Sequence, residues 1–352
     1  MGIDYLRLSL TDRCNLNCVY CTPLEKRGFL RHEDLLRHEE ITRAVAAFVK
    51  AGVRKVRLTG GEPLVRKNIV GLVEMLRAIP GLEELALTTN GLLLEELAAP
   101  LREAGLDRVN ISLDSLKKET FEKITGSVSF DKVWRGVEAA LEMWPRGVKL
   151  NVVLMRRLND AEAADFARLT LDRPLSVRFI EFYATNARAA RLGDALVPTA
   201  ATRRRIEDAL GPLEAVAPSQ ADGLGRHSPQ SVPGPGDIAP GTCGAGGSLF
   251  RALRPAGPAR VYKLRGAKGR IGFISGRSDY FCGACNRVRM DCAGKVYPCL
   301  FAGATHDLRD LLRRGAPEEA LYSYIKKVFL VKSNHRKDTP GSGHIEMSSI
   351  GG

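Results

Sequence analysis

Short apolar runs alternate with longer stretches of helical periodicity through the amino-terminal half of the chain. The apolar runs are rich in β-branched residues and predict strands at residues 5–10, 55–58, 84–87, 108–113, 149–154 and 176–182. A helical pattern follows each of them. In the first helix Ile41, Val45, Phe48 and Val49 recur at helical spacing, and Gly52 follows as a candidate cap. This alternation predicts βα units around a parallel sheet.

Six consecutive βα units with short connections predict an α/β fold, in the form of a partial (βα)6 TIM-like barrel. Functional groups in such folds gather where the strands end. Polar residues follow the second, third and fourth predicted strands at 59–63, 88–91 and 114–115, and Glu181 and Tyr183 lie near the end of the sixth. We therefore expect one polar mouth at the carboxyl edge of the sheet.

Residues 217–247 are rich in glycine and proline and predict a flexible insertion, in which Cys243 is an incidental exposed thiol. A helix is expected before it at residues 202–210, and hairpin strands after it at 260–264 and 270–275. The predicted organisation is a barrel at residues 1–216, the insertion at 217–247, and a C-terminal α+β extension at 248–352. That extension carries a second group of cysteines and a helical tail.

A hydrophobic content of 44% with 26% charged residues is ordinary for a globular protein, and no apolar run is long enough to span a membrane. The start of the chain does not read as a secretory signal, so we expect a cytoplasmic protein without a membrane partner. The net charge of +13 invites a polyanion, although a solvated basic face would give the same charge. Aromatic residues are only 6% and form no stripe among the basic ones, so we expect no nucleic acid partner.

Three cysteines, Cys14, Cys18 and Cys21, lie in the stretch RCNLNCVYC, and most of the eight cysteines fall into two tight groups. Disulfide frameworks belong to small secreted domains, so metal or cluster binding is the better interpretation. A zinc site would need a fourth ligand, such as His32 or His38. Three thiolates that hold a four-iron cluster would instead leave one iron open to a small molecule.

The second group, Cys282, Cys285 and Cys299, lies in the stretch FCGACNRVRMDCAGKVYPCLF. A zinc ribbon is the alternative here, because Cys292 supplies a fourth thiol. Arg287 and Arg289 alternate along a predicted strand beside these cysteines, so both side chains point to one face. Arginine binds phosphate oxygens through paired hydrogen bonds. Metal ligands and anion-binding groups are therefore expected side by side.

Two motifs resemble the radical S-adenosylmethionine superfamily: CxxxCxxC with Tyr20 before its last cysteine, and Gly60-Gly61-Glu62-Pro63 after the second strand. The resemblance implies that the amino acid part of S-adenosylmethionine completes the open iron, with Glu62 near its amino group. Over nearly the whole chain the sequence also resembles the GTP 3′,8-cyclase family, molybdenum cofactor biosynthesis protein A. The motifs are LRLSLTDRCNLNCVYC, RLTGGEPLVRK, LTTNG, NISLDSL, VKLNVV, RFIEF, FCGACNRVRM and the terminal IGG.

This resemblance implies two [4Fe-4S] clusters, the first held by Cys14, Cys18 and Cys21 and the second by Cys282, Cys285 and Cys299, with its open iron at the guanine base. The implied S-adenosylmethionine pocket contains Tyr20, Gly61, Glu62, Ser112 and Tyr183. The implied GTP-binding residues are Arg7, Arg57, Thr88, Lys149, Arg287 and Arg289, with Lys55 and Arg178 as further cations at the same mouth. Arg287, Arg289, Gly351 and Gly352 are implied to act in catalysis, the last two by reaching into the active site.

The implied reaction converts GTP to 3′,8-cyclo-7,8-dihydro-GTP, the first step of molybdenum cofactor (molybdopterin) biosynthesis. It begins with a 5′-deoxyadenosyl radical that removes the 3′ hydrogen of GTP. Cyclic pyranopterin monophosphate synthase would act next, and an electron donor would reduce the clusters. A homodimer is left as an open possibility at this point. Three features depart from the family pattern: Tyr183 stands where methionine is usual, the insertion is long, and Cys292 is an extra thiol.

Two alternatives remain at this point. A radical enzyme with an auxiliary cluster that modifies peptides would favour more C-terminal cysteines and would not need Arg287 or Arg289. A metal-bearing RNA-binding regulator would explain the net charge, but it predicts aromatic stacking platforms among the basic residues.

Overall fold

The frame of the protein is one sheet of twelve strands, in the order β12-β11-β10-β1-β2-β3-β4-β5-β6-β9-β8-β7. The computed structural model describes residues 2–22, 28–217, 259–276, 285–300 and 302–335. Outside these ranges lies the predicted insertion with its Cys243, apart from Ala217. Cys282, Gly351 and Gly352 also lie outside them. Within them, no helix is both long and apolar enough to cross a membrane.

The centre of the sheet consists of six parallel strands that pair in sequence order. They are β1 Tyr5–Ser9, β2 Lys55–Thr59, β3 Glu84–Thr89, β4 Arg108–Ser112, β5 Val148–Leu154 and β6 Ser176–Glu181. All six predicted strands are confirmed, with ends that differ by two residues at most. The α/β prediction is therefore correct.

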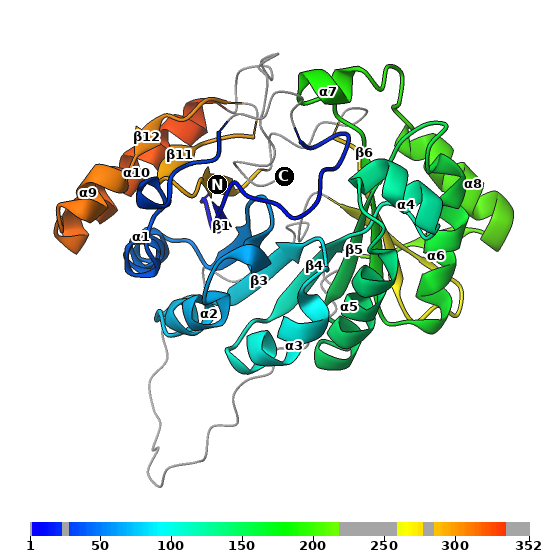
Figure 1. Ribbon diagram of the computed structural model, residues 1–352, viewed down its shortest axis with the longest axis horizontal. Helices are drawn as coiled ribbons and strands as arrows, with labels where there is room; N and C mark the ends of the chain where they lie inside the picture. Colours follow the sequence, from blue (N-terminus) through cyan, green and yellow to red (C-terminus); the bar gives the residue numbers. More distant parts are fainter. Residues whose placement is uncertain (1, 23–27, 218–258, 277–284, 301, 336–352) are drawn as a thin grey trace, which may run out of the picture.

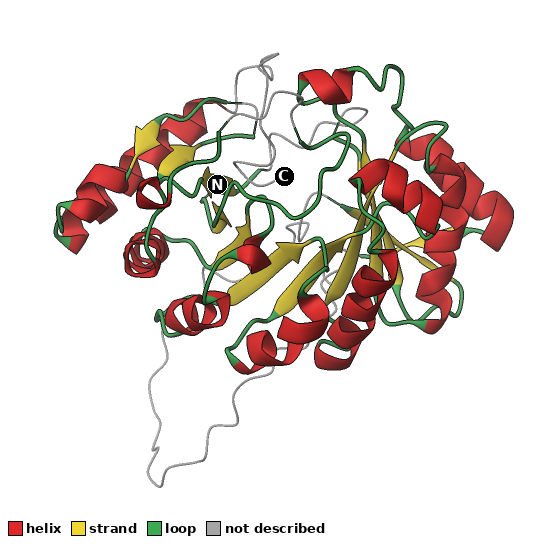
Figure 2. Ribbon diagram, viewed as in Figure 1, coloured by secondary structure: helices red, strands yellow, loops and turns green. Residues whose placement is uncertain are grey.

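Helices cover the outer face of this curved sheet, and Figure 2 shows the strands on the inside. They are α1 His38–Lys50, α2 Ile69–Arg77, α3 Leu94–Glu103, α4 Lys118–Thr125, α5 Phe130–Met143, α6 Ala163–Asp172 and α8 Thr199–Leu210. The short helix α7 Ala187–Ala190 lies beyond the end of β6 (Figure 1), and the 3-10 turns are η1 His32–Asp34, η2 Pro63–Val65 and η3 Asp160–Glu162. Gly52 follows α1 with a φ of 118°, and its N–H donates to the Val49 carbonyl at 3.0 Å. The predicted cap is thus confirmed.

C-terminal strands extend both edges of the central sheet (Figure 1). At one edge β9 Arg270–Ile274 runs parallel to β6 and continues into the antiparallel β8 Arg260–Leu264 and β7 Leu213–Ala215. At the other edge β10 Arg287–Met290 runs parallel to β1 and continues into β11 Lys295–Tyr297 and β12 His306–Asp307. The predicted hairpin is confirmed, and the C-terminal residues complete the sheet that the first half of the chain begins.

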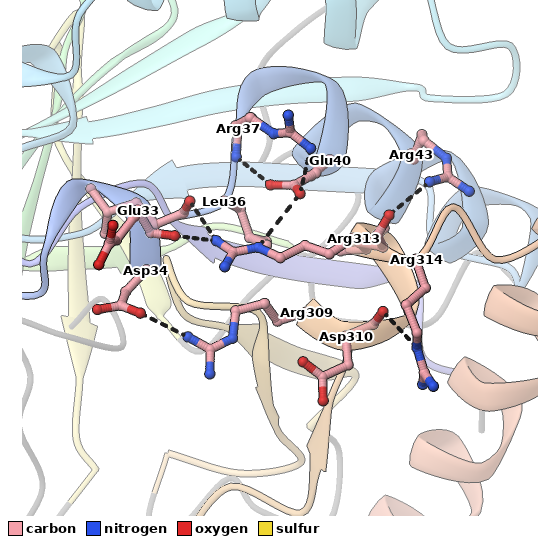
Figure 3. Close-up of polar contacts among 12 residues, drawn as sticks. Glu33, Asp34, Leu36, Arg37, Glu40, Arg43, Arg309, Asp310, Arg313 and Arg314 are labelled. Atoms are coloured by element: carbon pink, nitrogen blue, oxygen red, sulfur yellow. Dashed lines mark hydrogen bonds and ion pairs between the residues drawn. The ribbon is translucent and has the colours of Figure 1, made fainter.

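Two C-terminal helices, α9 Arg309–Arg313 and α10 Glu318–His335, attach the end of the described chain to α1. Arg43 donates to the carbonyls of Leu312 and Ala316. Figure 3 shows polar contacts on this side, among them the pair of Arg309 and Asp34 at 3.4 Å. On α10, Phe329 packs its ring against Phe48 at 6.3 Å between centroids. Contacts with the first helix therefore determine the position of α10.

We expect Arg43→Met to destabilise the protein by about 1–2 kcal/mol, because it removes two side-chain hydrogen bonds at the end of α9 and takes the donor from the partly buried Ala316 carbonyl. Urea unfolding followed by circular dichroism measures the change. The matched control is Arg314→Met. The Arg314 side chain donates to the carbonyl of Asp310, an exposed residue one turn earlier in the same helix (Figure 3). The control should change the unfolding free energy by less than about 0.5 kcal/mol, and equal losses in both variants would contradict the assigned role of Arg43.

Candidate active site

The inner face of the sheet, opposite the helices, is lined by basic and polar side chains. On β1 the fully buried Leu6 and Leu8 belong to the hydrophobic core, so Tyr5 and Arg7 point to the other face. The same alternation places the other predicted substrate-binding residues on this face, namely Lys55, Arg57, Thr88, Lys149, Arg178, Arg287 and Arg289. The sequence thus produces a sheet with one apolar and one cationic face.

Strand register brings these side chains together. Arg7 lies beside Arg57 on β2 and beside Arg289 on β10, while Tyr5 lies between Lys55 and Arg287. Lys55 and Arg287 are the first residues of their strands. They therefore lie at the amino end of the sheet, and the expectation that Lys55 sits at the carboxyl mouth is wrong. The basic residues extend down the inner face from the mouth.

Arginines surround the ring of Tyr5. The Arg57 Nε donates to the Tyr5 hydroxyl, and the guanidinium carbons of Arg57 and Arg287 each lie 5.8 Å from the ring centroid. Burial, followed by the charge of Arg289, holds the pKa of Arg7 well below its ordinary value. Burial and then Arg287 lower the pKa of Arg289 to about 10. These cations repel one another in a buried space, so a polyanion that entered it would be strongly stabilised.

Several buried polar atoms on the inner face have no hydrogen-bond partner among the described residues. They are the Arg57 Nη1, the Thr88 Oγ1, the Asn110 Oδ1 and the Asn151 Oδ1. Arg57 is only 6% exposed and Asn110 only 4%. Buried polar groups are normally paired, so this set indicates the position of a ligand that accepts from the arginine and donates to the asparagines.

One carboxylate, that of Glu84, lies among the cations. It is 3.4 Å from Arg108 and 3.8 Å from Lys55. Burial raises its pKa, but Arg108 and Lys55 outweigh burial and hold the pKa below the ordinary value. The sequence analysis missed Arg108, which begins β4 and lies on the inner face in register with Ala86. Its signal was present, because Arg108 alternates with the apolar residues of that strand.

The loop after β1 places the first cysteine group at the carboxyl ends of the strands. Its backbone is attached to the end of α4, where Asn17 and Val19 donate to the carbonyls of Thr125 and Ile124, both at 2.9 Å. Asn186, just before α7, donates to the carbonyls of Tyr20 and Cys21 at 3.2 and 3.1 Å. Neither Asn186 nor the end of α4 was singled out from the sequence, since only the folded chain brings them to this loop.

The three thiols of this loop influence one another. Burial, followed by the charge of Cys21, raises the pKa of Cys18 well above its ordinary value, and burial and then Cys14 raise the pKa of Cys21 to about 12. The three thiols therefore lie within electrostatic reach of one another, and bound iron would stabilise their thiolates.

A zinc site is not supported in the described part of the chain, where no three Cys, His, Asp or Glu side chains gather around a single ion position. Neither His32 nor His38 therefore completes such a site with the triplet. Each thiolate of a four-iron cluster binds a different iron, so its ligands stand further apart than those of one zinc ion. The donor set fits a cluster.

Two glycines allow the GGEP segment to approach the cysteine loop closely. A Cβ on Gly60 would lie 2.5 Å from the Thr11 carbonyl oxygen, and one on Gly61 would collide with the Arg13 backbone. The Gly61 N–H donates to the Thr11 carbonyl at 2.7 Å, and the Glu62 N–H to that of Arg13 at 2.8 Å. Only glycine permits this contact, which aligns the GGEP segment with the loop.

Glu62 itself is 1% exposed and accepts three hydrogen bonds. Its carboxylate binds the Leu64 N–H at 3.0 Å, the Thr89 hydroxyl at 2.7 Å and the Asn90 N–H at 2.7 Å. Burial raises its pKa to about 7. Glu62 therefore ties the end of β3 to the GGEP segment, and its predicted contact with the amino group of S-adenosylmethionine stays a prediction.

Tyr20 is held by Asp114, to which its hydroxyl donates at 2.7 Å. Asp114 also accepts from the Val153 N–H at 2.8 Å, and burial raises its pKa to about 6. Asn90 donates to Asn15 at 2.7 Å and approaches the Cys14 sulfur at 3.8 Å. Asp114 and Asn90 fall inside segments expected at the mouth, but the sequence did not indicate which side chains they bind.

The other two predicted pocket residues lie at the ends of β4 and β6. Ser112 is the last residue of β4, on the inner face in register with Asn151 of β5. Tyr183 follows β6, and a Cβ added to Gly276 would collide with its hydroxyl. Both residues lie at the carboxyl edge, where the sequence predicted a polar mouth.

Two residues of the second cysteine group, Cys285 and Cys299, lie in the described part of the chain, where they flank the hairpin of β10 and β11. Arg289 lies within electrostatic reach of both thiols. Cys292 is 2% exposed and lies in the turn between β10 and β11, where its carbonyl accepts from the Leu36 N–H at 2.8 Å. Burial, followed by Asp291, raises the pKa of Cys292 to about 12. The interpretation that Cys292 is not a cluster ligand stays a prediction.

Comparison with known proteins gives a consistent result over the whole chain. Residues 8–170 match the Radical SAM superfamily, and residues 248–337 match Molybdenum Cofactor Synthesis C. The chain is 44% identical to a GTP 3′,8-cyclase of Heliobacterium modesticaldum, over 99% of this chain and 98% of the relative, and 42% identical to one of Moorella thermoacetica over the same shares. The crystal structure of Streptococcus suis SuiB bound to precursor peptide SuiA has a similar fold, with a TM-score of 0.50, 15% identity, and 93% of this chain and 67% of that chain covered.

The raised pKa of Glu62 predicts a pH-dependent stability. Its native value of about 7 lies above the ordinary 4.5, so the native state binds more protons than the unfolded state between these values. Its contribution to the unfolding free energy therefore falls as the pH rises through this window, by at most about 3 kcal/mol.

Urea unfolding of the metal-free protein at pH 4.5, 6 and 7.5 tests this expectation. Glu62→Gln cannot ionise, so its stability relative to the wild type should improve across the window. The exposed Glu142→Gln on α5 is the control and should follow the wild type. Parallel pH profiles for Glu62→Gln and the wild type would contradict the prediction.

Proposed function

This chain belongs to the GTP 3′,8-cyclase family, and we propose that it converts GTP to 3′,8-cyclo-7,8-dihydro-GTP in the first step of molybdenum cofactor biosynthesis. The match to Molybdenum Cofactor Synthesis C supports the pathway. A reduced [4Fe-4S] cluster with S-adenosylmethionine supplies the hydrogen-abstracting chemistry when both are bound. The residues of the chain bind, orient and enclose the nucleotide.

The single observation that carries the proposal is the cationic inner face beneath the cysteine loop. Arg7, Arg57 and Arg289 lie side by side in register, and the buried Arg57 Nη1 has no partner among the described residues. A triphosphate would neutralise these cations and accept from their N–H groups. The inner face also carries Asn110 and Asn151, whose buried carbonyl oxygens suit N–H or O–H donors of a nucleoside.

The orientation of GTP is inferred from what lies at the two ends of the inner face. The first cysteine loop lies at the carboxyl ends of the strands, held against α4 and α7, whereas Lys55 and Arg287 lie at the amino end. We infer that the triphosphate extends toward the amino end, which leaves the ribose closer to the cluster loop. S-adenosylmethionine would then lie above the ribose, near Tyr20, Gly61, Glu62, Ser112 and Tyr183.

The finer architecture belongs to the same proposal: a partial (βα)6 barrel at residues 1–216, the insertion, and a C-terminal region that carries a second [4Fe-4S] cluster on Cys282, Cys285 and Cys299. Its support is the position of Cys285 and Cys299 beside Arg289. The open iron of this cluster would hold the guanine base, and Gly351 and Gly352 would reach the site. A downstream synthase, an electron donor and a cytoplasmic location complete the proposal.

The experiment that tests the function is anaerobic reconstitution followed by reaction with S-adenosylmethionine, dithionite and GTP. We expect about eight irons per chain, four for each cluster, together with GTP-dependent release of 5′-deoxyadenosine and formation of the cyclic product. Deoxyadenosine release that does not respond to GTP would overturn the substrate, and zinc in place of iron would overturn the enzyme class.

We expect Arg57→Met to raise the Kd for GTP at least about tenfold, which corresponds to about 1.4 kcal/mol, because a buried charged donor is lost. Calorimetric titration of the reconstituted protein with GTP, GDP and guanosine measures the effect. The loss should shrink from GTP to guanosine. The control is Arg168→Met on the outer helix α6, where Arg168 is 52% exposed, and it should leave all three affinities unchanged. A uniform loss for all three ligands would contradict the assignment of Arg57 to the phosphates.

A further inference from the structure

Lys332 occupies a core position of α10. Among the residues of this helix whose burial is described, 318–332, the buried ones are Leu321, Ile325, Val328 and Lys332. The first three are fully buried, and Lys332 is 4% exposed. Their spacing of three and four residues forms one stripe on the inner side of the helix. An apolar residue is the ordinary occupant of such a position, so a lysine there requires a reason.

The ammonium group of Lys332 reaches the second cysteine group. It donates to the Pro298 carbonyl at 2.7 Å and to the Cys285 sulfur at 3.6 Å. Pro298 directly precedes Cys299. One side chain therefore connects the two described segments that bear the second set of thiols, from a helix that begins nineteen positions after Cys299 in the chain.

Electrostatics favours a charged partner for this lysine. A buried ammonium group is costly unless it is paired with an opposite charge. A neutral thiol is a weak hydrogen-bond acceptor, whereas a cysteine thiolate that ligates iron carries a negative charge opposite to that of Lys332. The geometry is thus the one expected if Cys285 is a cluster ligand, and it comes from a residue that no cysteine motif contains.

We infer that Lys332 is a positioning residue for the second cluster: its ammonium group fixes Cys285 against the Cys299 segment and adds a positive charge beside the cluster sulfur. This inference rests on the proposed second cluster. Hydrogen bonds to the sulfurs and nearby net charge set the reduction potential of iron–sulfur clusters. A positive charge stabilises the reduced cluster, which is the more negative state. Loss of Lys332 should therefore lower the potential of the second cluster and loosen its iron.

The packing of α10 fixes the position of Lys332 relative to the cysteine hairpin. Phe329 packs against Phe48 of α1, and Lys50 of α1 pairs with Glu319 at 2.7 Å. These contacts hold the helix to the first half of the chain, which also bears β1. Since β10 pairs with β1, the cysteine hairpin and the helix that carries Lys332 are both fixed to the same scaffold.

The test is a potentiometric titration of the reconstituted holoenzyme, with the two clusters resolved by electron paramagnetic resonance. Lys332→Gln keeps a donor for the Pro298 carbonyl but removes the charge, and Lys332→Arg keeps the charge. The matched control is Lys327→Gln, because Lys327 is exposed on the same helix. A second readout is the rate at which a chelator removes iron.

For Lys332→Gln we expect the ratio of reduced to oxidised second cluster to fall about tenfold at a fixed potential, which is about 59 mV for one electron. Iron loss from that cluster should become about tenfold faster. The first cluster should keep its potential and serves as the internal check that the variant is folded. Lys332→Arg should restore the potential, and Lys327→Gln should match the wild type. If Lys332→Gln holds only the first cluster, rescue by Lys332→Arg is the expected result, and failure of that rescue would overturn the role of the charge.

The negative outcomes separate the inference from the function on which it rests. A wild-type protein that binds only about four irons would overturn the second cluster and the inference together. Two clusters with an unchanged potential and iron retention in Lys332→Gln would overturn the role of Lys332 alone.

Discussion

Mutual repulsion among buried arginines is the constraint on which the rest of the structure depends. Arg7, Arg57, Arg287 and Arg289 lie around Tyr5 on adjacent parallel strands, and burial with repulsion lowers the pKa of Arg7 and of Arg289. Isolated like charges in a low dielectric are strongly unfavourable. The protein tolerates them because the outer face of the same strands is packed into the main core, whose burial stabilises the sheet whatever lies on the inner face. A bound polyanion removes the repulsion, so the free energy held in this arrangement becomes available for binding.

The C-terminal strands join the same sheet and do not form a separate layer, and this arrangement completes the arginine cluster. Two of the arginines lie on β10, and the parallel pairing of β10 with β1 places Arg289 beside Arg7. The pairing also brings Cys285 and Cys299 to the edge of the cationic face. Contacts of α9 and α10 with α1 then fix this edge from the outside, through the arginine network of Figure 3 and the packing of Phe329 on Phe48. Metal ligands from distant parts of the chain are thereby held by one continuous sheet.

Local periodicity determined how far the sequence alone could be interpreted. The six central strands were predictable because β-branched runs and their capping residues, such as Gly52, are local signals. The alternation of Arg287 and Arg289 was equally local, and the structure agrees with it. By contrast, the pairing of β10 with β1 joins residues from opposite ends of the chain, and no periodicity reports such a contact. For the same reason Glu62 could be identified from the sequence, but its hydrogen bonds to Thr89 and Asn90 could not. Lys55 was likewise expected at the carboxyl end of the sheet, whereas it lies at the amino end.

Residues that support a site are harder to find than residues that form it, because their types follow from their environment and not from the chemistry. Asn186 caps a short helix and at the same time binds two carbonyls of the cysteine loop, and a capping asparagine attracts no attention in a sequence. Lys332 is the opposite case, since a lysine in an otherwise apolar stripe is anomalous once the helix is known. Such an anomaly is informative because burial of a charge without a partner would destabilise the fold. Lys332 donates to the Cys285 sulfur, and this bond links the last described helix to the second cysteine group.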